Sequence, residues 1–192
     1  MDPADFEGAF QEHFAPVYRF IGRRVGPDLA EDLAADTFAT AYRRRASYQP
    51  GRASVRAWLY GIAANVLRNH WRDEQRLLAL DAQLAAADDG TEAPAIIDVV
   101  NDRLLASSLA PRIAAALQLL TAEQREVLLL YAWAELSHEE IAAALEIAPG
   151  TARSRLSRAR AALRRQLGDF DFDLWIFEPP AIGHGKEGRD HA

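Results

Sequence analysis

The sequence predicts an all-α protein of two small helical domains joined by an acidic linker, followed by a C-terminal extension rich in acidic and aromatic residues. Apolar residues recur at helical spacing through most of the chain, and no run alternates polar and apolar residues before that extension. Residues 85–94 combine small, acidic, glycine and proline residues, a composition typical of a linker between domains. We therefore expect a first domain over residues 1–80, a linker with a lead-in helix over 81–110, a second domain over 111–167 and the extension over 168–192.

Three helices are expected in the first domain. The first covers residues 6–25 and ends before Gly26 and Pro27. The second starts at Asp28, where Glu31 three residues later would complete a capping box, and residues 48–51 break it. The third covers about residues 55–80. The apolar residues of the first helix are expected to face inward: Phe10, Phe14, Val17, Tyr18 and Ile21.

The second half is expected to end in a short helix, a tight turn and a longer helix. Helices near residues 96–108 and 111–120 come first. Thr121 with Gln124, and Ser137 with Glu140, each match a capping box and predict two further helix starts. A turn at residues 146–150 then precedes a last helix over residues 151–167. This order of elements is typical of a helix-turn-helix.

The charge of the chain is unevenly distributed. The net charge is −6, yet residues 41–76 contain eight basic and two acidic residues, and residues 149–167 contain six arginines and no acidic residue. Only local charge meets a phosphate backbone within a Debye length, so two polyanion contacts are expected on one chain. Lys186 is the only lysine among the 22 basic residues.

Several classes of function are excluded by the composition. The chain has no cysteine, which excludes disulfides and thiolate metal sites. No apolar stretch approaches the roughly 18 residues that cross a bilayer, and the N-terminus is acidic where a signal peptide is basic. We therefore expect a cytoplasmic protein without membrane insertion. No phosphate-binding glycine loop, catalytic motif or metal-ligand cluster is visible, so we assign no catalysis, metal or cofactor.

The last helix has the character of a DNA-recognition helix. Leu156, Ala159 and Leu163 fall on one face, and arginines and serines cover the opposite face. A solvated amphipathic helix is the alternative interpretation. Such helices usually mix charges of both signs, whereas six like charges repel unless an external anion neutralises them, and this favours DNA binding.

The run GTARSRLSRARAALR over residues 150–164 resembles region 4 of bacterial sigma factors, which reads the minus-thirty-five promoter element. The resemblance extends over residues 121–167. Glu146 departs from the family pattern, which has a glycine in the turn. Either the turn avoids positive φ or it carries some strain, and we expect it to be slightly altered. The resemblance implies that six residues of the last helix face bases or nearby phosphates: Arg153, Ser154, Arg155, Ser157, Arg158 and Arg160.

Residues 6–76 resemble sigma region 2, most clearly in AEDLAADTFATAYRR (residues 30–44) and RASVRAWLYGIAANVLRNHWRDEQR (residues 52–76). In the family the first run docks on the clamp helices of the largest polymerase subunit. The alternative for Leu33 and Phe38 is a place in the hydrophobic core. The resemblance assigns polymerase binding to Asp32, Leu33, Asp36, Thr37, Phe38 and Tyr42.

The third helix carries a stripe of basic and amide side chains that suits a single DNA strand, because cations follow phosphates and amides read unpaired bases. Its aromatic residues Trp58, Tyr60 and Trp71 are stacking platforms or packing residues. In the family the preceding loop, here residues 47–54, captures a base flipped out of the minus-ten element. The minus-ten assignment covers Trp58, Asn65, Arg68, Asn69, Arg72 and Arg76.

Two modules with an acidic linker are the minimal layout of the extracytoplasmic-function group of sigma factors. The resemblance implies promoter-directed transcription initiation with assistance in melting, and two partners: core RNA polymerase, through clamp helices and flap, and promoter DNA. An anti-sigma factor is one alternative for regulation. Residues 168–192 are expected to dock on region 4, and a sharper alternative is autoinhibition, in which their acidic and aromatic side chains cover the arginine face of the last helix. The rival hypotheses are a DNA-binding regulator that is not a polymerase subunit and a protein-interaction adaptor.

Overall fold

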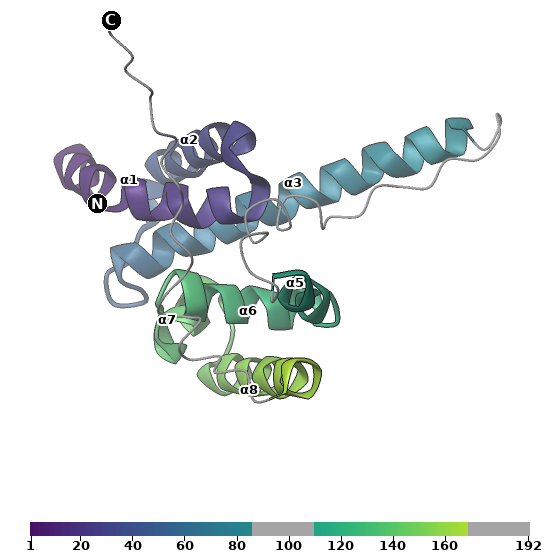
Figure 1. The fold of residues 1–192 in the computed structure, drawn as a ribbon. Helices are drawn as coiled ribbons and strands as arrows, with labels where there is room; N and C mark the ends of the chain where they lie inside the picture. Colours follow the sequence, from purple (N-terminus) through teal and green to yellow (C-terminus); the bar gives the residue numbers. More distant parts are fainter. Residues whose placement is uncertain (86–109, 169–192) are drawn as a thin grey trace, which may run out of the picture.

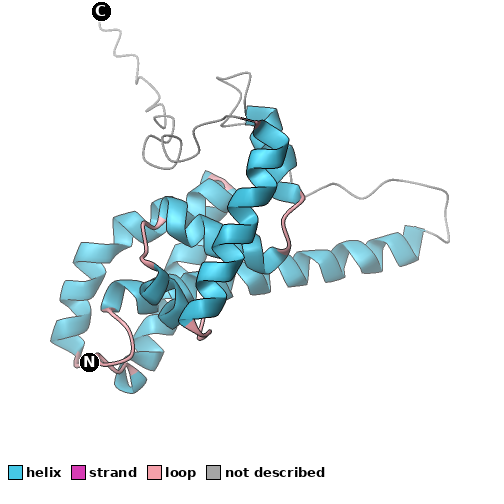
Figure 2. Cartoon of the chain, turned by 90° about the horizontal axis from the view of Figure 1, so that it is seen from below, coloured by secondary structure: helices cyan, strands magenta, loops and turns pink. Residues whose placement is uncertain are grey.

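The structure, a computed structural model of the chain, describes residues 1–85 and 110–168. Within these residues every regular element is helical, which confirms the predicted fold class (Figure 2). The helix expected near residues 96–108, nearly all of the expected linker and the C-terminal extension lie outside the described residues.

Helices α1 (Pro3–Val25) and α2 (Pro27–Arg44) form an antiparallel pair joined by Gly26. Gly26 has φ 81°, in the region that favours glycine, and it allows α2 to begin at once with Pro27. The capping box expected at Asp28 is therefore wrong. Asp28 already lies in the first turn of α2, and the N-cap residue is Gly26, which has no side chain to accept a bond.

The core of this half lies between α1, α2 and α3 (Val55–Ala85). Val17 and Ile21 of α1 are fully buried, as expected, and Phe14 and Tyr18 are half-buried. Phe10 is the exception, because 40 % of its surface is exposed at the edge of the α1–α2 pair. The inward position predicted for Phe10 is thus wrong.

A short 3-10 helix, η1 (Arg45–Ser47), and a turn lead from α2 into α3. The break predicted at residues 48–51 is confirmed. Helix α3 is five residues longer than expected, and its C-terminal turns project beyond the other helices (Figures 1 and 2). Among the described helices, including this one, none combines the length and apolar character needed to cross a membrane.

The second half contains α5 (Ala110–Gln118), α6 (Ala122–Trp133), α7 (His138–Ala144) and α8 (Pro149–Leu167). Both predicted capping boxes are present and complete. Thr121 caps α6 with Gln124, and Ser137 caps α7 with Glu140. Helix α8 begins two residues earlier than expected, because Pro149 is well suited to the first turn of a helix.

The two halves pack against each other through α3 and α7. Figure 1 shows α3 between the α1–α2 pair and the helices of the second half. The closest approach is at Gly61, where a Cβ atom would overlap the backbone of Ala144. Residue 61 must therefore be glycine for the helices to meet this closely.

Replacing Gly61 with alanine tests this contact. In an open helix, glycine to alanine stabilises by about 0.5–1 kcal/mol, but here the added methyl group must push α7 away from α3. We expect Gly61→Ala to lower the free energy of unfolding by about 1–3 kcal/mol in urea denaturation. Gly8→Ala in α1 is the matched control, since nothing lies within 4 Å of its Cβ position. Equal stabilisation by both substitutions would contradict the close packing.

Candidate nucleic-acid interface

Helix α8 presents two contrasting faces. Leu156 and Leu163 are 1 % exposed and Ala159 is fully buried, so the predicted core face is confirmed. The rest of the helix surface carries six arginines and no acidic residue. Of the residues predicted to bind the minus-thirty-five element, Arg153, Ser157 and Arg158 are exposed, and Ser154, Arg155 and Arg160 are half-buried.

A hollow of about 240 Å³ lies between α8 and the start of α7. His138 of α7 contributes to it, and the guanidinium of Arg160 lies 4.6 Å from the ring centroid of Tyr131. This stacking fixes the position of Arg160 against α6. A hollow bordered by guanidinium groups suits a phosphate. Its lining from α8 is Arg153, Leu156, Ser157, Arg160 and Arg164.

The turn before α8 keeps the left-handed backbone even though a glutamate occupies it. Glu146 has φ 54°. The amide of Glu146 donates to the carbonyl of Ala143 at 3.4 Å, and the amide of Ile147 donates to the carbonyl of Ala142 at 3.0 Å. These two hydrogen bonds form the Schellman pattern. Of the two alternatives for this turn, the one that avoids positive φ is therefore wrong, and the one that accepts strain describes it. Glu146 adopts the conformation itself, at some cost in backbone strain.

The stripe on α3 is exposed over about three turns of the helix. Asn65, Arg68, Asn69, Arg72 and Arg76 all face solvent. Arg68 donates to the side-chain oxygen of Asn65 at 2.8 Å, and Arg72 donates to that of Asn69 at 3.4 Å, so amides and guanidinium groups alternate along one surface. On another face of the same helix, Leu59 and Ile62 are buried in the core.

Trp58 differs from the rest of the minus-ten set. It is half-buried, and its ring centroid lies 5.1 Å from that of Tyr48 in the preceding loop. The Tyr48 hydroxyl in turn donates to the carbonyl of Ala53 at 3.0 Å. Trp58 therefore holds the loop of residues 47–54 against the start of α3, which corresponds to the packing alternative.

The residues predicted to bind polymerase are divided by burial. Asp32, Asp36 and Tyr42 are exposed on α2. Leu33 and Phe38 are 8 % and 4 % exposed, so the core alternative describes both. Thr37 is fully buried and donates its hydroxyl to the carbonyl of Leu33 at 2.7 Å. These three side chains have little surface to offer a partner.

Tyr42 belongs to an exposed aromatic edge whose other ring, that of Phe10, was missed by the sequence reasoning. Phe10 and Tyr42 are 40 % and 44 % exposed, and Leu29 on the same helix pair is 40 % exposed. The ring of Phe10 lies 5.0 Å from that of Phe38, between centroids, so buried and exposed aromatic rings are continuous. The excess of aromatic residues on the first helix was the available signal, but periodicity placed Phe10 inside.

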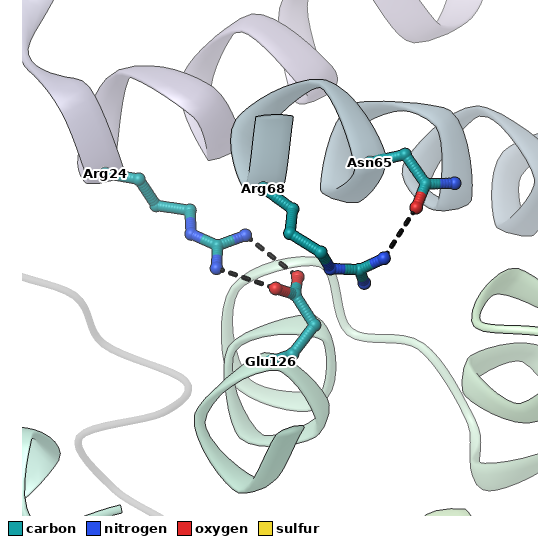
Figure 3. Close-up of polar contacts among 4 residues, drawn as sticks. All are labelled: Arg24, Asn65, Arg68 and Glu126. Atoms are coloured by element: carbon teal, nitrogen blue, oxygen red, sulfur yellow. Dashed lines mark hydrogen bonds and ion pairs between the residues drawn. The ribbon is translucent and has the colours of Figure 1, made fainter. Parts of the chain in front are cut away.

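Polar contacts lock the two halves together. Both guanidinium nitrogens of Arg24 on α1 donate to the carboxylate of Glu126 on α6, at 3.0 and 3.1 Å (Figure 3). The side chains are 10 % and 12 % exposed, so the pair is largely buried. Arg56 of α3 also donates to the carbonyl of Ala134. No local pattern signals this pair, because its residues are 102 positions apart.

A second polar contact ties the loop before α3 to α7. The Ser54 hydroxyl donates to Glu140 at 3.1 Å, and the amide of Ser137 donates to the other oxygen of that carboxylate at 3.0 Å. Partial burial raises the pKa of Glu140, but the hydrogen bonds from Ser137 and Ser54 outweigh it, and the pKa lies below the ordinary value. Glu140 thus serves both the cap of α7 and the contact between the halves.

Comparison with known proteins gives consistent matches to both halves. Residues 9–77 match the family described as sigma-70 region 2, and residues 111–163 match sigma-70 region 4. The RNA polymerase sigma factor CarQ of Myxococcus xanthus is 35 % identical over 170 residues, which cover 88 % of this chain and 92 % of CarQ. The ECF RNA polymerase sigma factor SigW of Bacillus subtilis is 33 % identical, over 80 % of this chain and 83 % of SigW.

This chain is an extracytoplasmic-function sigma factor. It acts in promoter-specific initiation of transcription with RNA polymerase. Because the first half matches region 2, the alternative of a DNA-binding regulator outside the polymerase is set aside, and so is the adaptor.

Solved structures with the same fold include the sigma factor RpoE of Bartonella quintana in complex with the anti-sigma factor NepR. It is 28 % identical with a TM-score of 0.56, and the match covers 85 % of this chain and 96 % of that one. CnrH in complex with the cytosolic domain of CnrY has a TM-score of 0.58 at 24 % identity, over 85 % of this chain and 88 % of CnrH, and supports the fold alone.

In the sigma factor the two predicted DNA-binding surfaces meet at one cleft. The cleft has a volume of about 840 Å³ and lies between α3, α5, α6, the turn before α8 and α8 itself. Arg68 and Arg72 of the α3 stripe line it together with Arg155 of α8. Arg24 and Arg125 also line it, and the sequence reasoning gave neither a role.

Substitution of Glu126 tests the lock between the halves. Glu126→Gln leaves the Arg24 charge largely buried without its counterion, so we expect a loss of about 3 kcal/mol in the free energy that holds the halves together. The chain has no cysteine, so spin labels on cysteines introduced at the exposed positions Glu12 and Gln166 report the separation directly. We expect longer distances in the variant.

Asp73→Asn is the matched control for this measurement. It removes the exposed Arg76–Asp73 pair within α3, whose side chains are 70 % and 67 % exposed, and should leave the distances unchanged. The double variant Arg24→Met, Glu126→Leu should return them toward those of the parent chain. Unchanged distances in Glu126→Gln would show that the pair does not hold the halves together.

Proposed function

We propose that this sigma factor binds its promoter through two separate surfaces, α8 on the minus-thirty-five duplex and the α3 stripe on the melted minus-ten strand. The observation that carries the proposal is the pairing of two exposed surfaces rich in arginine, one on each half of the chain. Run-off transcription with core polymerase and a cognate promoter is the direct test. Absence of a specific transcript would refute the assignment.

On α8 the degree of burial suggests how the work is divided. Arg153, Ser157 and Arg158 are exposed near the start of the helix, the part that enters the major groove in helix-turn-helix proteins. We assign base contacts to these three. Arg155 and Arg160 are half-buried and better suited to phosphates at the rim of the groove. Ser154 donates its hydroxyl to the carbonyl of Thr151, so it supports the helix start.

On α3 the amides and guanidinium groups are proposed to follow a single strand. Arg68, Arg72 and Arg76 are spaced four residues apart, which places their charges at intervals of about 6 Å along the helix. This spacing is close to the distance between successive phosphates of an extended strand. Trp58 is assigned a positioning role for the loop of residues 47–54, which would take up the flipped base of the minus-ten element.

Polymerase docking is proposed for the exposed residues of α2. Asp32, Asp36 and Tyr42 can contact the clamp helices directly. Leu33, Thr37 and Phe38 hold that face in place from the core, as their burial suggests. The exposed aromatic edge at Phe10 extends the surface with an apolar contact, of the kind enriched in interfaces. Region 4 would contact the polymerase flap.

The arrangement of the halves suggests that the protein opens before it binds a promoter. The centres of the two promoter elements are about 85 Å apart on straight duplex DNA. Arg68, Arg72 and Arg155 line one cleft, so the two surfaces cannot reach both elements at once in this form. We infer that the structure represents the free protein and that polymerase separates the halves.

The proposed role needs no chemistry by the sigma factor itself, since bond formation belongs to the polymerase. The protein is proposed to act in the cytoplasm, where the polymerase is found. The Bartonella quintana neighbour is held by an anti-sigma factor, and an equivalent protein partner is proposed here as one means of regulation.

Arg158→Ala should weaken recognition of the minus-thirty-five element. If Arg158 reads a base, we expect a loss of about 1–3 kcal/mol in promoter binding by the holoenzyme and a relaxed preference at one position of that element. Electrophoretic competition with base-substituted promoters measures both. Arg112→Ala, at an exposed arginine outside α8, is the control and should change neither. Undiminished discrimination in Arg158→Ala would remove the base contact from the proposal.

Arg72→Ala should impair melting more than initial binding. Loss of a phosphate contact to the separated strand raises the free energy of the open complex, while the closed complex with duplex DNA is retained. Permanganate reactivity of unpaired thymines measures the open fraction, which we expect to fall several-fold. Arg72→Lys should keep most of the open fraction, because a phosphate contact requires charge more than geometry. Arg19→Ala, at an exposed position of α1, is the control and should leave the open fraction unchanged. Normal melting by Arg72→Ala would show that the separated minus-ten strand does not contact Arg72.

A further inference from the structure

The cleft between the halves has the composition of a binding site for an acidic, aromatic peptide. Its floor is apolar and includes Trp71 of α3, Leu129 and Trp133 of α6, and Ile147 of the turn before α8. Leu129 is 4 % exposed, and the other three are half-buried. An apolar recess of this size is unusual on the surface of a small protein that has no occupant for it.

The rim of the cleft is positively charged. Five arginines and two glutamates line it. One of the glutamates, Glu126, is already neutralised by Arg24. The other, Glu123, has a lowered pKa, chiefly because of its hydrogen bond at the start of α6, with smaller contributions from Arg155 and Arg68. A surplus of guanidinium charge around an apolar floor favours a ligand with acidic groups on either side of apolar ones.

The chain itself contains such a segment directly after α8. Residues 173–178 read Asp-Leu-Trp-Ile-Phe-Glu, so a carboxylate stands at each end of four large apolar residues. The four residues before it, 169–172, alternate acidic and aromatic side chains. No lysine or arginine occurs between positions 166 and 185. The segment therefore complements both the floor and the rim of the cleft.

The reach of the chain favours this occupant over a separate one. Arg155, at the cleft, lies thirteen residues before Gly168, a distance of about 20 Å along α8. An extended chain covers that distance in about six residues, which brings residues 174–177 to the cleft. A tethered segment of this kind is present at an effective concentration on the order of millimolar, far above that of a free cellular partner.

We infer that residues 173–178 bind in the cleft between the halves and hold the free sigma factor in its closed form. The bound segment covers Arg68, Arg72 and Arg155, and so shields part of both DNA-binding surfaces at once. Polymerase, by separating the halves, divides the cleft and releases the segment. This inference rests on the proposed function of these arginines, and it goes beyond it by naming what occupies the cleft.

Photo-crosslinking of the full-length chain tests the location. A photoreactive phenylalanine analogue in place of Trp175 should crosslink within the same molecule to residues that line the cleft, as mapped by mass spectrometry. The same analogue at Glu187, further along the extension, is the control and should give no such crosslinks. Crosslinks from position 175 to a second copy of the chain, to residues 86–109 or only to the exposed face of α8 would overturn the inference.

Charge reversal tests the regulation. Asp173→Arg with Glu178→Arg should release the segment and raise the affinity of the free protein for promoter DNA roughly tenfold, as measured by fluorescence anisotropy. Glu187→Arg with Asp190→Arg changes the net charge of the extension by the same amount and controls for non-specific attraction to DNA. Equal affinities in the two double variants would refute the inference.

Holoenzyme assays separate this outcome from failure of the proposed function. Both double variants and the parent chain should initiate transcription equally well once bound to core polymerase, because the segment is then displaced. If the parent holoenzyme recognises its promoter but the two double variants bind DNA alike in the free state, the inference fails and the proposed function stands. If the parent holoenzyme recognises no promoter, the proposed function itself fails.

Discussion

The close approach of α3 and α7 is the constraint on which the rest of the arrangement depends. Gly61 lets the backbone of Ala144 come within contact distance of α3, and this brings the second half of the chain alongside the α3 stripe. The Arg24–Glu126 pair and the bond from Ser54 to Glu140 then form across the gap. The cleft exists only while these contacts hold, because its walls come from both halves.

This dependence explains how a chain with two nucleic-acid surfaces can be folded and yet be unready for its promoter. The halves are joined by polar contacts as well as by the packing of α3 on α7 at Gly61. A polar contact is easily exchanged for one with water or with a larger partner, so the closed form can be stable alone and still yield to polymerase. A wholly apolar seam of the same extent would be harder to open.

Much of the fold follows from local rules, and the sequence reasoning found those parts. The buried face of α8 follows from the spacing of Leu156, Ala159 and Leu163, and the starts of α6 and α7 follow from complete capping boxes. The errors arose where an adjacent residue or the packing of two helices, and not the local sequence pattern, determined the structure. Pro27 opened α2 ahead of the expected cap, and Phe10 lies on the helical repeat but at the edge of the pair. The contact between Arg24 and Glu126 had no local signature, so the cleft, and the places of Arg24 and Arg125 in it, could not be found from the sequence.

The basic surfaces described above are built from guanidinium groups alone, and this has a consequence for their control. The single amine side chain of the protein, Lys186, stands in the C-terminal extension. Acetylation, which silences lysine-rich DNA-binding surfaces by removing charge, has no target on α3 or α8. Guanidinium groups also stay protonated at any pH the cell experiences. The charge of these guanidinium groups is in effect permanent, so covering and uncovering them is a means of control that does not require a change in their charge.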